Sequence, residues 1–233
     1  MPSKISRLNV ILSCLSPADL ALLEPHLSAV DLPLRKVLER HGKTIDYVYF
    51  PEHGFASVVA NGDGHRSIEV GLMGREGMTG LTVVMGLDRS PHQIFIQCAG
   101  DGWRISSLQL RKAIKESATL HQVCLAYAHA FLVHTGYTAM ANGRSKIEER
   151  LARWLLMAHD RIDSDQLPLT HEFLSLMLGV RRPGVTVALN LLERAGLIAR
   201  SRGAITILDR DGLRDCSNGA YGAQEAEAKR LST

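Results

Sequence analysis

The fold of this chain is decided by residues 170–208, which read THEFLSLMLGVRRPGVTVALNLLERAGLIARSRGAITIL. Thr170 can cap a short helix, and Gly179 supplies a tight turn after it. A second helix is predicted from about Arg182 to Ala195, where Gly196 stops it. Two short helices around a glycine turn predict a helix-turn-helix unit.

The second helix of this unit has two distinct faces. Its apolar side chains are spaced to face a core (Val185, Leu189, Leu192), and polar side chains with a four-residue spacing point to solvent (Arg182, Thr186, Asn190). Arginine can read guanine edges and asparagine can read adenine, so this face has the chemistry of major-groove recognition. Taken alone, the same pattern also fits an ordinary solvated helix face.

A small hairpin with a basic tip is predicted directly after the two helices. Apolar residues 197–199 and 204–208 flank the sequence Arg200-Ser201-Arg202-Gly203. This arrangement is typical of a wing, whose arginines hold DNA phosphates. We therefore predict phosphate contacts from the wing and from the start of the first helix (Arg200, Arg202, Thr170, His171), whereas Arg181 at the helix cap fits either role.

Upstream, residues 31–106 have the texture of short strands, because brief apolar runs alternate with glycine-rich turns. The strongest hairpin signal is residues 61–64, between apolar residues 56–59 and 67–70. This part is predicted to be a barrel or sandwich.

A long helix is predicted from about residue 118 to residue 142, before Asn142-Gly143 stops it. Side chains spaced by three and four form a heptad seam (Leu120, Val123, Tyr127, Ala130, His134, Tyr137, Ala141). This seam favours a homodimer, with packing inside the chain's own domain as the alternative. In the seam, His134 is interpreted as a polar residue that sets register.

Composition restricts the class of protein. The 233 residues are 45% hydrophobic and 22% charged with a net charge of +3, which excludes a disordered chain, a collagen-like chain and a membrane bundle. The small charge means that any nucleic-acid surface is local. Four widely spaced cysteines indicate neither a zinc knuckle nor a disulfide scaffold, and we expect a cytoplasmic protein with reduced thiols.

Several motifs together resemble the bacterial Crp/Fnr family of transcription regulators. They are residues 178–186 and 192–198 in the C-terminal half, and residues 49–51, 63–66, 70–77 and 80–81 in the N-terminal half. The resemblance covers nearly the whole chain in the right order. It implies an α+β chain with a double-stranded β-roll sensor domain at 1–117, a dimerisation helix at 118–142 and a winged helix-turn-helix domain at 143–233. The implied partners are double-stranded DNA, a second copy of the chain and RNA polymerase.

The chain departs from this family where specificity is decided. Arg181, Arg182 and Pro183-Gly184 replace the usual start of the recognition helix, and Val187 stands where a further arginine is common, so the familiar half-site does not carry over. In cyclic-AMP-binding members, a glutamate holds the ribose and an Arg-Ser or Arg-Thr pair holds the phosphate. Here residues 77–81 put Met78 in place of the glutamate, and methionine cannot accept a ribose hydrogen bond in that way.

The same residues give weaker support to other effectors and to other functions. Arg89-Ser90 resembles the phosphate pair, yet Arg89 also fits a solvated loop charge, and cyclic AMP is doubtful as effector. Cys14 alone makes no iron–sulfur set, and no cofactor is predicted, although loop histidines leave a haem ligand open (His41, His53, His65, His92). A cupin-like metal enzyme would need more compact histidines. A winged helix that binds protein instead of DNA is a further alternative. We expect no catalysis.

Overall fold

The computed structural model describes residues 8–62, 67–222 and 226. These residues form two compact units. The first holds residues 8–58 and 73–130, and the second holds residues 59–62, 67–72, 131–222 and 226.

Two sheets make up the predicted β-roll. Their strands are β1 (Ser28–Leu32), β2 (Val37–Glu39), β3 (Tyr47–Pro51), β4 (Phe55–Asn61), β5 (Ser67–Met73), β6 (Gln93–Cys98) and β7 (Gly100–Ser106). The strand order is β1-β7-β3 in one sheet and β2-β6-β4-β5 in the other. The neighbouring strands β4 and β5 confirm the predicted hairpin, although part of its turn, at 63–66, lies outside the described residues.

Short helices complete the first unit. They are α1 (Val10–Cys14), α2 (Pro17–Leu23), a 3-10 turn η1 (Glu24–His26), α3 (Leu81–Val84) and α4 (Ser107–Glu116). The side chain of Asn9 caps α1, and its amide donates to the carbonyls of Pro51 (2.9 Å) and Gly77 (2.8 Å). This buried amide therefore joins the start of the chain to two separate turns.

Met78 belongs to the hydrophobic core of the first unit, together with Phe50, Leu110 and Cys124. Its side chain is fully buried, so it serves packing rather than ligand binding. The preceding Gly77 lies against Tyr127, since a Cβ built at residue 77 would come within 2.0 Å of the Tyr127 hydroxyl oxygen. Only glycine allows this close approach.

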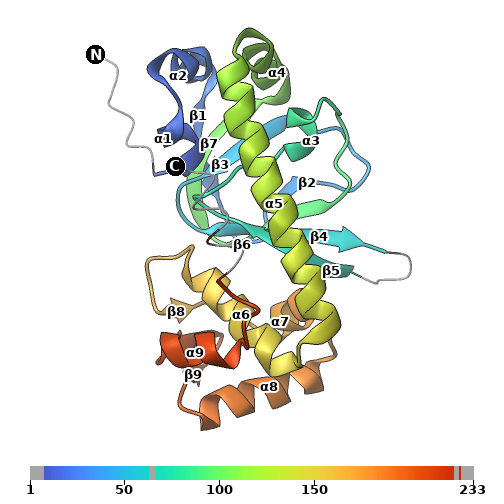
Figure 1. Cartoon of the computed structure of the whole chain (residues 1–233), viewed down its shortest axis with the longest axis vertical. Coiled ribbons are helices and arrows are strands. Elements are labelled where there is room, and N and C mark those ends of the chain that lie inside the picture. Colours follow the sequence, from blue (N-terminus) through green and yellow to red (C-terminus); the bar gives the residue numbers. More distant parts are fainter. Residues whose placement is uncertain (1–7, 63–66, 223–225, 227–233) are drawn as a thin grey trace. The chain divides into compact units, whose positions relative to one another are not determined.

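Helix α5 (Ala118–Arg144) is a single long helix in Figure 1, and it runs two residues beyond its predicted end. Its buried side chains are Leu120, Cys124, His134, Thr138 and Ala141. Three residues of the predicted dimer seam, Leu120, His134 and Ala141, thus pack inside their own chain, which favours the alternative of packing within the chain at these positions. The other predicted seam residues are partly buried (Val123, Tyr127, Ala130, Tyr137).

Among these buried residues, His134 shows the packing inside its own chain most clearly. Its ring stacks on Phe131 with 5.8 Å between ring centroids, and its carbon edge lies close to Gly71. Burial and the nearby charges of Arg161 and Arg153 hold the pKa of His134 well below its usual range. His134 is thus a neutral core residue.

A different stripe of α5 faces solvent. The large apolar side chains of Leu125, Leu132 and Met140 are 40%, 69% and 47% exposed. His129 and Gly136 are exposed between them. The spacing from 125 through 129, 132 and 136 to 140 is close to a heptad seam. We call Leu125, His129, Leu132, Gly136 and Met140 the outer stripe of α5.

The second unit contains the predicted helix-turn-helix and wing. Its further elements are α6 (Ile147–His159), β8 (Gln166–Leu167), α7 (His171–Leu178), α8 (Arg182–Arg194), β9 (Ile198–Ser201), β10 (Ala204–Ile207) and α9 (Arg210–Cys216). Figure 1 shows α7 and α8 as two short helices, and the wing sheet has the order β8-β10-β9. Gly179 ends α7 in the left-handed conformation, with φ of 61°. The predicted elements are confirmed, and α8 ends one residue before its predicted end.

No helix among the described residues is long and apolar enough to cross a membrane. The four cysteines (Cys14, Cys98, Cys124, Cys216) form no disulfide. Burial raises the pKa of the Cys124 thiol to about 12, so this thiol is inert in the core.

Candidate nucleic-acid interface

The inner face of α8 fixes how this helix is presented. Val185, Leu189 and Leu192 are buried, as is Ala188. These side chains pack α8 against the rest of the helix-turn-helix unit, where α7 and α6 are its neighbours. The opposite face of α8 is therefore the one available to a partner.

The start of α8 carries two exposed arginines. Arg181 is the residue before the helix and Arg182 its first residue, and Pro183 follows in the first turn. The Arg182 guanidinium lies 3.9 Å from the Glu172 carboxylate, with both side chains more than two-thirds exposed. An exposed pair at this distance contributes little, so Arg182 can leave Glu172 for another acceptor at small cost.

The middle of α8 presents a mixed surface. Thr186 donates its hydroxyl to the Arg182 carbonyl (3.1 Å), which leaves its oxygen and methyl group for contacts. Val187 and Leu191, which are not among the base-reading residues predicted from the sequence, are 59% and 45% exposed. Pro183, Val187 and Leu191 are spaced by four residues, and this spacing is the sequence signal that places them on one face of α8. Apolar groups here can contact thymine methyl groups.

Asn190 and Arg200 are held by each other. Arg200 on β9 donates from Nη2 to the Asn190 side-chain oxygen (2.8 Å) and from Nε to the Glu193 carboxylate (2.9 Å). The Arg200 guanidinium is thus engaged inside the domain, whereas its predicted contact with a DNA phosphate stays a prediction. Hydrogen bonds from Arg200 also hold the pKa of Glu193 below its usual range.

The tip of the wing remains open. Ser201, Arg202 and Gly203 are exposed, and Gly203 makes the turn between β9 and β10 with φ of 77°. The Arg202 side chain is therefore open to solvent, and its contact with a DNA phosphate stays a prediction. Arg181 and Arg182 are the other exposed arginines considered in this unit.

The start of α7 presents Thr170 and His171, which are both exposed. The Thr170 hydroxyl oxygen caps α7 by accepting from the backbone N–H of Phe173 (3.3 Å). Its hydroxyl hydrogen can still be donated. Both side chains have the chemistry to meet a phosphate, as predicted.

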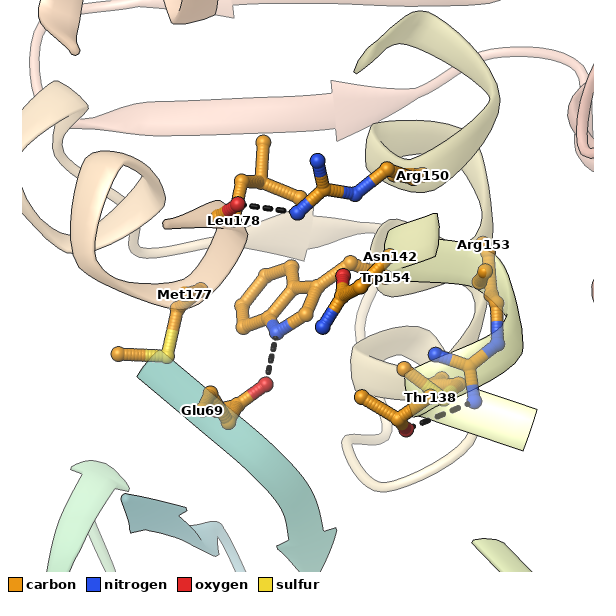
Figure 2. Close-up of a pocket in the computed structure, with 10 residues that line it drawn as sticks. Glu69, Thr138, Asn142, Arg150, Arg153, Trp154, Met177 and Leu178 are labelled. Atoms are coloured by element: carbon orange, nitrogen blue, oxygen red, sulfur yellow. Dashed lines mark hydrogen bonds between the residues drawn. The ribbon is translucent and has the colours of Figure 1, made fainter. Parts of the chain in front are cut away.

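A hydrogen-bonded joint anchors α6, as Figure 2 shows. The Trp154 indole N–H donates to the carboxylate of Glu69 on β5 (2.6 Å), and Arg150 donates to the Leu178 carbonyl at the end of α7. Arg153, which is 4% exposed, donates to the Thr138 hydroxyl on α5 (3.1 Å). These bonds connect α6 to β5, α7 and α5. We therefore interpret the small pocket that these residues line as part of the structural framework and not as a ligand site.

The segment that resembles a phosphate-binding cassette is satisfied internally. Arg89 is exposed and donates to the Gly42 carbonyl (3.1 Å). Ser90 and Thr79 are buried near the Glu39 carboxyl, which accepts from the Gly80 N–H (2.7 Å). The Ser90 hydroxyl donates to the His92 carbonyl (2.9 Å), and the Thr79 hydroxyl oxygen accepts from the Tyr49 N–H (3.0 Å). Burial raises the pKa of Glu39 above its ordinary value despite these hydrogen bonds. The chain thus places its own carboxyl among these donors.

Among the histidines considered as haem ligands, His41 lies near His92, and burial together with the charge of His41 lowers the pKa of His92. His41 bonds the Pro91 carbonyl (2.7 Å), and His53 bonds the Asp101 carboxylate (2.7 Å). His65 lies outside the described residues. In the described ranges, no three His, Cys, Asp or Glu side chains are grouped so as to hold a metal.

Comparison with known proteins agrees with this geometry. Residues 149–216 match the Crp-like helix-turn-helix domain. A comparison with curated proteins finds no match. The matched range holds α6 through α9, which includes both helices of the helix-turn-helix unit and the wing.

Solved structures extend the likeness of fold to most of the chain. A regulator assigned to the Crp/Fnr family from Eubacterium rectale has a TM-score of 0.71 at 19% identity, covering 90% of this chain and 98% of its own. A Crp-family regulator from Thermus thermophilus has a TM-score of 0.70 at 17% identity, covering 83% and 99%. FixK2 from Bradyrhizobium japonicum has a TM-score of 0.68 at 16% identity, covering 82% and 96%.

Proposed function

We propose that this chain is a DNA-binding transcription regulator of the Crp/Fnr family and that it acts as a homodimer on a palindromic operator. The observation that carries the proposal is the outer face of α8, where Arg181, Arg182 and Val187 are exposed and Thr186 is partly exposed, in a unit whose wing tip also exposes Arg202. RNA polymerase stays a predicted partner.

The exposed residues divide by their chemistry into base readers and phosphate anchors. Arg182 and Thr186 lie on the outer face of α8, which fits the major groove. Arg202, Thr170 and His171 lie at the wing tip and the start of α7, where they meet phosphates. Because the two copies of a dimer read two half-sites, these half-sites are about 34 Å apart, one helical turn.

The test is a set of binding isotherms on a selected operator and on a scrambled duplex at several salt concentrations. Arg182→Ala is expected to lose about 1–3 kcal/mol on the operator and little on the scrambled duplex. Arg202→Ala is expected to weaken both duplexes alike and to flatten the log-log salt dependence by about one unit. Equal losses for Arg182→Ala on both duplexes would move Arg182 from reader to anchor. Absence of binding to any duplex would overturn the proposal.

The outer stripe of α5 supports the homodimer. It presents Leu125, Leu132 and Met140 to solvent on a helix whose other face is filled by its own chain. Large apolar side chains in a heptad-like row are an interface for a second helix, and the small Gly136 allows two helices to approach closely. The proposed seam is thus the outer stripe, in place of the register predicted from the sequence.

Leu132→Glu tests this seam, because it places like charges opposite each other across a two-fold axis. Light scattering should show monomers, and operator affinity should fall by about tenfold or more, since one half-site no longer supports the other. Leu108→Glu on α4 is the matched control, as Leu108 is 63% exposed outside the stripe. A Leu132→Glu variant that remains dimeric would contradict the seam.

A further inference from the structure

The wing is attached to α8 by three residues, Asn190, Glu193 and Arg200, which we call the wing clamp. Besides its side-chain bonds, Arg200 donates its backbone N–H to the other Glu193 oxygen (3.2 Å). Glu193 therefore receives both the backbone and the guanidinium of Arg200. Side chains of Arg200 and Glu193 are only 28% and 37% exposed, so this pair is better shielded than the Arg182–Glu172 pair.

The clamp also determines which way the Asn190 amide points. A guanidinium has donors and no acceptor, so Asn190 can face Arg200 only with its oxygen. The 2.8 Å contact from Arg200 Nη2 to Asn190 Oδ1 has this geometry. The Asn190 NH2 group is consequently left as the free end of the side chain.

The position of Asn190 gives this orientation a consequence for DNA. Asn190 lies one turn after Thr186 and two turns after Arg182, and it is partly exposed. An asparagine reads adenine by donating to N7 while its oxygen accepts from N6. In the clamp, that oxygen is already bonded to a charged donor, and the NH2 group leads.

We propose that Arg200 is a positioning residue. By bonding the Asn190 oxygen, it leaves the Asn190 NH2 group, a hydrogen-bond donor, to contact the bases of the operator. The proposal rests on the proposed DNA-binding function and names the base edge that is read. Asn190 selects guanine (acceptors O6 and N7) or thymine (acceptor O4) over adenine, because the adenine N6 donor beside N7 meets no free acceptor on the clamped amide. Arg200 contributes through the orientation of Asn190 and makes no phosphate contact.

The experiment measures base preference by selection from a randomised operator and by isotherms on the four duplexes that differ at one base pair. The position read by residue 190 is the one whose preference disappears in Asn190→Ala. At this position the unaltered protein should favour guanine or thymine over adenine by about tenfold. Arg200→Ala should remove this preference or shift it toward adenine, while the salt dependence and the preferences at other positions stay unchanged.

Two further variants separate positioning from other roles. Arg200→Lys keeps the charge but cannot form the fork, so a phosphate contact would survive it and the clamp would not. Glu193→Gln weakens the anchor of Arg200 without touching the arginine, and it should shift the same base preference in a smaller degree. In the double variant with Asn190→Ala, Arg200→Ala should have no added effect on base preference.

Each contrary result has a distinct meaning. A uniform loss on all duplexes with a flatter salt dependence, restored by Arg200→Lys, would make Arg200 a phosphate contact and overturn the inference. An adenine preference in the unaltered protein, or an unchanged preference in Arg200→Ala, would also overturn it while leaving DNA binding intact. Failure of the unaltered protein to bind any duplex would overturn the proposed function together with the inference.

Discussion

Two arginine-containing segments of this chain use their polar groups in opposite ways. At the start of α8, Arg181 and Arg182 stand exposed, with only a loose ion pair to Glu172. In the segment at 79–90, the buried hydroxyls face Glu39 and the Arg89 guanidinium bonds a carbonyl. Open donors are available to a partner, whereas satisfied donors contribute to the fold. The first segment therefore offers donors to a partner, as the proposed function requires, and the second segment contributes to internal structure.

The largest effect should come from removing the open donors. The double variant Arg181→Ala with Arg182→Ala should lose about 2–4 kcal/mol of operator binding. Its free energy of unfolding should change by less than about 0.5 kcal/mol, because both side chains are exposed. Operator isotherms and urea unfolding measure the two quantities. A large decrease in the free energy of unfolding would show that Arg181 and Arg182 stabilise the fold, which would contradict their contrast with the segment at 79–90.

Glu39→Ala should have the reverse effect. It removes the acceptor for the Gly80 N–H and the buried carboxyl that lies near Thr79 and Ser90, so the free energy of unfolding should fall by about 1–3 kcal/mol. Operator affinity should be unchanged at temperatures where the variant is folded. If the variant keeps full stability, Glu39 is not the group that satisfies the Gly80 N–H.

The pH dependence of stability sharpens the role of Glu39. Burial raises its pKa in the folded protein above the ordinary 4.5, so folding favours the protonated carboxyl. The stability that protonated Glu39 supports is present below the unfolded-state pKa and is lost as pH rises through the higher folded-state pKa. Glu39→Gln removes this titration. Urea unfolding of both proteins should therefore show a difference that shifts in favour of Glu39→Gln as pH rises through this window, and a constant difference would contradict the assignment.

The smallest effects are expected at Arg89-Ser90, the pair that resembles the phosphate-binding residues of cyclic-AMP-binding family members. Arg89→Ala should change the free energy of unfolding by less than about 0.5 kcal/mol, because its bond to Gly42 is exposed. Millimolar cyclic AMP should leave operator affinity within about twofold, since Met78 is in the core and Ser90 faces Glu39. Titration calorimetry that detects micromolar binding of cyclic AMP would show that this segment recognises ligands after all.

Sequence patterns alone were sufficient for the helix-turn-helix unit and the wing. Residues 170–208 are dense in local signals, namely a threonine cap, a left-handed glycine turn and a 3.6-residue apolar period, and these act over a few residues. The β4–β5 hairpin was predictable for the same reason.

Only the tertiary structure shows which of the predicted site residues are exposed and which are packed or hydrogen-bonded inside the chain. The heptad spacing in α5 fits more than one face of the same helix, and packing of Leu120 and His134 inside their own chain selected the outer stripe for solvent. The surroundings of Arg200 and Arg202 differ although the two lie two residues apart, because a strand places Arg200 beside Glu193 and the turn leaves Arg202 exposed. Local sequence determines which elements form, since their signals are short-range, but the pairing of polar groups depends on residues brought together from distant parts of the chain.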